Sequence, residues 1–124
     1  MWRIACASAS LLACVAHAQT VPVPAATLYA CHAESINEAL VRQCSVHPSF
    51  TKSAEEALKQ WKSMYGQRAK ARAQTCTAPM EANLKAHLQQ LRAAANQPEF
   101  CRTAIQQLRG GPGTAEDRIW ESGG

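Results

Sequence analysis

Apolar side chains recur every three or four positions along most of the chain, which is the spacing of one face of an α-helix. The strongest run lies between residues 51 and 75. Glu55 and Glu56 stand near its start and Arg72 near its end, so the charge changes from acidic to basic in the direction that the helix dipole favours. We predict one continuous helix here, with Trp61 as the main core side chain. Its buried face would contain Ala54, Ala57, Leu58, Trp61, Met64, Tyr65 and Arg68.

The same pattern predicts three further helices, over residues 27–44, from Pro79 to about Ala95, and over residues 98–108. Pro48 ends the first of them, because proline disfavours helical backbone in the residue before it. Alanine and leucine are abundant, and both favour helix. The sequence therefore predicts an all-α fold, a small disulfide-stabilised bundle of about four helices in up-down order.

This helical domain, residues 27–109, is flanked by two segments of different composition. Residues 19–26 contain two prolines and are expected to form an extended, mobile leader. Residues 110–124 begin with a glycine-rich break and are expected to form a tail that is separable from the domain.

Residues 1–18 have the composition of an export signal. Arg3 supplies a positive charge, and the apolar stretch of residues 4–15 is shorter than the roughly 20 residues that span a bilayer. Small residues at Ala16 and Ala18 favour cleavage there, so Gln19 is the expected mature N-terminus and the protein is expected to be periplasmic or secreted. Residues 11–14 also resemble a bacterial lipobox, and lipidated Cys14 would then attach the protein to a membrane.

Four cysteines follow the predicted signal: Cys31, Cys44, Cys76 and Cys101. In an exported domain of this size they predict two disulfides. A helix from Cys31 to Cys44 would separate them by about 20 Å, too far for a disulfide. An up-down order instead pairs Cys44 with Cys101 and Cys31 with Cys76. The pairing of Cys31 with Cys44 and of Cys76 with Cys101 stays open as the alternative.

The net charge and the absence of certain motifs argue against several classes of function. The net charge of +4 is too mild for a nucleic-acid-binding surface. No nucleophile motif, C-x-x-C pair or phosphate loop occurs, so neither an enzyme nor a cofactor or metal site is expected. The acidic pair Glu116-Asp117 is interpreted as helix-start charge.

Five residues are candidate contacts to a protein partner, in two groups. Ile119 and Trp120 are large apolar side chains beyond the glycine break, although packing of Trp120 on its own domain explains that residue more simply. Arg68, Lys70 and Arg72 form a basic run that could contact phosphate or anionic lipid, although a solvated helix end explains it more simply.

The preferred function is an exported, non-catalytic binding or interaction protein of the bacterial envelope. The order Cys, Cys, Pro-x-Phe and Ala-x-x-x-Trp over residues 31–61 resembles small cysteine-bearing helical proteins of that compartment, lysozyme-inhibitor-type modules among them. One alternative is a periplasmic stress chaperone that responds to pH through His32, His47 and His87. The other is a secreted effector or inhibitor of an extracellular enzyme.

Overall fold

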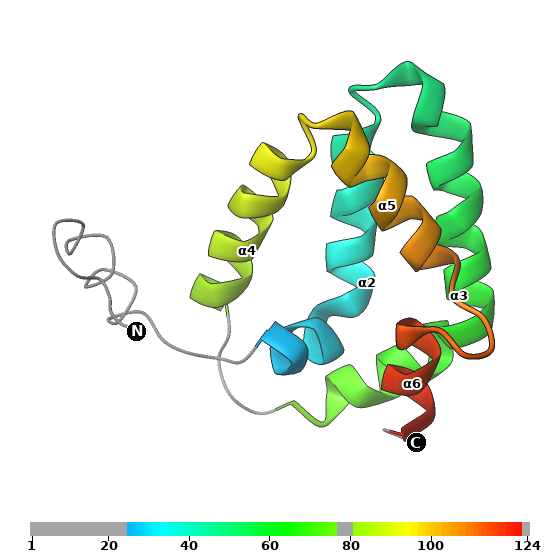
Figure 1. Ribbon diagram of the computed structural model, residues 1–124. Coiled ribbons are helices and arrows are strands. Elements are labelled where there is room, and N and C mark those ends of the chain that lie inside the picture. Colours follow the sequence, from blue (N-terminus) through cyan, green and yellow to red (C-terminus); the bar gives the residue numbers. More distant parts are fainter. Residues whose placement is uncertain (1–24, 77–80, 123–124) are drawn as a thin grey trace, which may run out of the picture.

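The computed structural model describes residues 25–76 and 81–122, and all regular structure in these ranges is helical (Figure 1). The all-α prediction is confirmed, but the described residues form five α-helices rather than about four, because part of the expected tail is also helical. The elements are α2 (Ala25–Cys44), the 3₁₀ helix η1 (Pro48–Phe50), α3 (Thr51–Gln74), α4 (Glu81–Ala94), α5 (Pro98–Arg109) and α6 (Ala115–Ser122).

The predicted signal, its cleavage point before Gln19 and the lipidation candidate Cys14 lie outside the described residues. Residues 77–80 and 123–124 lie outside them as well. Within the described ranges, no helix is both long enough and apolar enough to cross a membrane.

α2 is kinked. It begins at Ala25, inside the stretch expected to be extended, and its backbone is non-helical at His32, with φ −131° and ψ 28°. Figure 1 shows its first turns set at an angle to the remainder. The expected regular helix over residues 27–44 is therefore corrected to two helical segments. Cys31 lies beside the kink and is bonded to Cys76, so a disulfide connects the angled turns to the chain just after α3.

α2 lies between α3 and α4 and packs against both, and α5 packs against α3 (Figure 1). α3 runs over nearly the whole predicted range, and Trp61 is fully buried within it, at 0% exposure. Both α2 and α3 bury alanines, whose small side chains allow close helix packing. The largest side chains of the main core cluster are Leu40, Val41, Trp61, Tyr65, Leu91, Ile105, Leu108 and Trp120.

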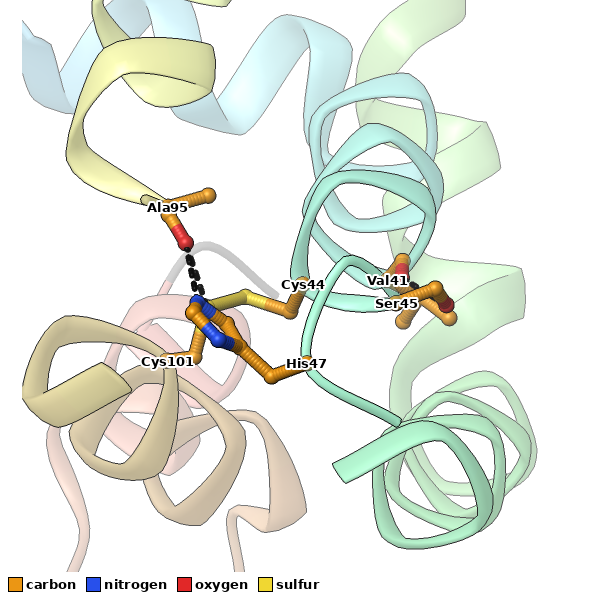
Figure 2. Close-up of a disulfide and its surroundings, with 6 residues drawn as sticks. All are labelled: Val41, Cys44, Ser45, His47, Ala95 and Cys101. Atoms are coloured by element: carbon orange, nitrogen blue, oxygen red, sulfur yellow. Dashed lines mark hydrogen bonds between the residues drawn. A yellow bond between two sulfur atoms is a disulfide. The ribbon is translucent and has the colours of Figure 1, made fainter. Parts of the chain in front are cut away.

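The two disulfides have the preferred pairing, Cys31 with Cys76 and Cys44 with Cys101. Figure 2 shows the second bond, between the end of α2 and the first turn of α5, with both cysteines fully buried. Beside it, the His47 ring nitrogen Nε2 lies 2.8 Å from the Ala95 carbonyl oxygen. This contact joins the loop after α2 to the loop between α4 and α5. Two such bonds indicate a non-cytoplasmic, oxidising environment.

Candidate functional site

The glycine-rich segment after α5 turns the chain back onto the domain. Gly110, Gly111 and Gly113 all have positive φ (63°, 111° and 82°), a conformation that glycine adopts without strain. A β-carbon at Gly110 would lie 2.6 Å from the Tyr65 ring, so this close approach also requires glycine. The predicted break therefore serves as a tight return, which places α6 against the core.

Local hydrogen bonds then fix the start of α6. The Thr114 hydroxyl accepts a hydrogen bond from the Asp117 backbone N–H at 3.1 Å, which is the contact of a helix N-cap. The Tyr65 hydroxyl accepts one from the Gly111 N–H at 2.8 Å and donates one to Asp117 at 3.1 Å. The return loop and the first turn of α6 are thus both attached to α3.

Glu116, in this first turn, is the central polar residue of the core. It is 9% exposed, and its Oε2 atom accepts three hydrogen bonds. The donors are the Tyr29 hydroxyl at 2.5 Å, the Trp61 indole N–H at 2.7 Å and the Trp120 indole N–H at 2.8 Å. A buried carboxylate is costly without such partners, and a buried indole N–H needs an acceptor. One oxygen atom therefore joins α2, α3 and α6.

Tyr29 extends this group of hydrogen bonds into α2. Its hydroxyl accepts a hydrogen bond from the Asn37 side-chain amide at 2.9 Å while it donates to Glu116. Burial raises the pKa of Tyr29 far above its ordinary value of 10.0, and the adjacent negative charge of Glu116 raises it further. The phenol therefore keeps its proton, and its hydrogen bond to Glu116, even at pH values above 10.0.

Trp120 packs on its own domain, which was the simpler of the two expectations, and it is not accessible as a partner contact. It is 1% exposed, with its ring centroid 6.1 Å from that of Trp61 and 6.0 Å from that of Tyr29. The Arg72 guanidinium lies 6.0 Å from the same ring. Glu116, one turn earlier on α6, supplies the acceptor that the buried indole requires.

The structure does not gather the five candidate contacts into one surface. Arg68 and Lys70 are exposed on α3, whereas Arg72 is half-buried over Trp120. Ile119 is half-buried and lines a cleft that α6 forms with α2 and α5.

This cleft, which we call the α2/α5/α6 cleft, has a volume of about 610 Å³. That volume lies within the usual range for small-molecule sites, about 300–1,000 Å³. Its apolar walls come from Leu40 of α2, Ala104 and Leu108 of α5, and Ile119 of α6. Its polar lining consists of the buried Asn37 and Glu116, the half-buried Tyr29, and neutral side chains such as Thr103, Gln106 and Gln107.

The lining determines what the cleft can hold. No lysine or arginine lines it, so an anionic group placed there would lose water without gaining a counter-ion. The Oε2 atom of Glu116 is already occupied by three donors. The walls of the cleft can make apolar contacts with a ligand, and their amide and hydroxyl groups can form hydrogen bonds with it. Both kinds of contact suit a neutral ligand.

The sequence reasoning missed Tyr29, Asn37 and Glu116. Glu116 looked like ordinary helix-start charge, but its spacing from Trp120 was a usable signal. Residues four apart share a helix face, so an acid and a tryptophan at that spacing can bury one hydrogen bond together. Tyr29 and Asn37 gave no comparable signal, because their partners are distant in sequence.

Comparisons with protein-family models, with curated proteins and with solved structures find no match to this chain. Among the described residues, no group of three or more histidine, cysteine, aspartate or glutamate side chains is arranged to hold a metal ion.

Proposed function

We propose that this chain is an exported, non-catalytic binding protein of the bacterial envelope that holds a small, neutral, mainly apolar ligand in the α2/α5/α6 cleft. The observation that carries the proposal is the composition of that cleft. Apolar walls surround a few buried polar groups that converge from α2 and α6, which is the usual make-up of a ligand site. The hydrogen bonds among Tyr29, Asn37 and Glu116 hold these groups in place before a ligand arrives.

The location of the protein rests on two further observations. The predicted signal at residues 1–18 favours export, with Gln19 as the mature N-terminus. The two disulfides agree with an oxidising compartment. A periplasmic or secreted protein accounts for both, and the intact mass of the exported chain would test the cleavage point.

Binding can be tested with N-phenyl-1-naphthylamine, a neutral apolar dye whose fluorescence increases in apolar surroundings. Ala104→Phe would fill the cleft, since Ala104 is half-buried in its wall. Ala86→Phe adds the same ring at an exposed position on α4 and serves as the control. We expect Ala104→Phe to weaken dye binding about ten-fold or more and the control to leave it unchanged.

A second filling variant, Thr103→Phe, alters the exposed rim and gives an independent reading if Ala104→Phe perturbs the fold. Circular dichroism would establish that each variant is folded. Equal dye affinity in the folded filling variants and in the control would contradict the proposed site.

A further inference from the structure

A second hollow, the α2/α4 groove, lies between α2 and α4 and has a volume of about 410 Å³. Its apolar surface consists of Ala39 from α2 and Leu84 and Leu88 from α4. Leu91 is the buried side chain of α4, whereas Leu84 and Leu88 are only half-buried. A continuous apolar surface on α4 therefore faces an open groove.

Three cations border this surface: Arg42 from α2, and Lys85 and Arg92 from α4. Glu81 is the one acid in the lining. The ion pairs among the described residues join Lys62 to Glu34 and Glu38, and Arg102 to Glu99; none involves the three groove cations. Like charges around an apolar surface repel one another, so an occupant with a negative group would be stabilised there.

The dimensions of the groove favour a small occupant. A stable protein interface buries about 800 Å² on each partner, whereas small-molecule sites have volumes of about 300–1,000 Å³. A hollow of about 410 Å³ belongs to the second class. Its occupant must present apolar surface to the leucines and negative charge to the cations.

We propose that the α2/α4 groove binds a single-chain anionic amphiphile. Its alkyl chain lies on Leu84 and Leu88, and its acidic head group lies beside the arginine and lysine side chains of the rim. This site is independent of the α2/α5/α6 cleft, whose lining carries no cation. The two sites thus differ in the charge of the ligand that each accepts.

The test is a calorimetric titration of the full disulfide-bonded protein with decanoate, at concentrations below those at which decanoate forms micelles. Lys85→Glu combined with Arg92→Glu reverses two rim charges. Lys52→Glu combined with Lys59→Glu makes the same change in charge on α3, away from the groove. All four positions are exposed, so both variants should fold. We expect the groove variant to weaken decanoate binding about ten-fold or more and the control to retain it.

Three further measurements separate this proposal from its rivals. Decyltrimethylammonium has the same chain with a cationic head, and equal binding of it would overturn the role of the rim charges. Ala104→Phe should leave decanoate binding unchanged; a loss would place the amphiphile in the α2/α5/α6 cleft and overturn the assignment. Binding of polyglutamate without binding of decanoate would assign the cations to a protein partner and contradict the proposal.

Discussion

The Glu116 Oε2 atom accepts a hydrogen bond from the Trp61 indole N–H at 2.7 Å, across 55 residues of sequence. The same oxygen atom receives the Trp120 indole and the Tyr29 hydroxyl. The C-terminal helix is therefore part of the core and not an appended tail. The α2/α5/α6 cleft depends on this arrangement, because α6 forms one of its walls.

Glu116→Ala should lower the free energy of unfolding by about 3–5 kcal/mol, because it leaves two buried indole N–H groups and a phenol without their acceptor. Glu116→Gln retains an acceptor oxygen and should cost less. Glu121→Ala, at an exposed position on the same helix, is the control and should stay within about 0.5 kcal/mol of the parent. Urea unfolding measures all three; a loss of under about 1 kcal/mol for Glu116→Ala would show that the carboxylate is not holding the core.

The raised pKa of Tyr29 predicts a loss of stability at high pH. In the unfolded chain the phenol ionises near 10.0, whereas in the folded chain it remains protonated. Its contribution is therefore fully present below pH 10.0 and is lost as the pH rises above that value, by up to about 1.4 kcal/mol per pH unit. Urea midpoints compared between the parent and Tyr29→Phe, from about pH 9 to about pH 11, isolate the effect. Parallel curves for the two proteins would refute it.

The two disulfides should differ in their resistance to reduction of the folded protein. Cys44 and Cys101 are both fully buried, whereas Cys76 is half-exposed. A thiol reductant must reach a sulfur atom, so the Cys31–Cys76 bond should open first. Alkylation of the freed thiols followed by peptide mapping would show the order.

Each bond closes a loop of about 45–57 residues, and loss of either should cost about 4 kcal/mol in the chain-entropy model.

Deletion of residues 112–124 should destabilise the protein severely. Viewed as a tail, this segment offers only one or two apolar side chains, worth about 1–3 kcal/mol in total. The structure adds the loss of the Glu116 acceptor and the cavity left by Trp120, so we expect a loss of more than about 4 kcal/mol. A marginally stable domain would then lose its cooperative thermal transition. Circular dichroism melts that coincide for the truncated and full chains would contradict this expectation.

The parts of the fold that sequence reasoning predicted are those set by local pattern. The amphipathic face around Trp61 predicted the range of α3 and its buried side, and helix order favoured the disulfide pairing that the structure has. The kink at His32 was missed because neither proline nor glycine marks it. α6 was misjudged because burial of Trp120 depends on acceptor and ring partners from three helices, and that juxtaposition has no periodicity along the chain.

The candidate site could not be predicted from the sequence either, because its residues are distant along the chain. The α2/α5/α6 cleft is lined by segments that are separated by a large part of the sequence, with Asn37, Ala104 and Ile119 meeting only after folding. Composition indicated a binding protein without catalytic motifs, but it could not show where the walls would meet.

The most direct test of the Glu116-centred core is to measure hydrogen exchange at the tryptophan indole N–H groups by NMR. The sequence has three tryptophans, and only Trp61 and Trp120 follow the predicted signal. If both indole N–H groups are bonded to Glu116, both should exchange only through global unfolding, at the same slow rate. Rapid exchange of the Trp120 indole in the folded protein would place α6 in solvent, and the core and the cleft described here would both be wrong.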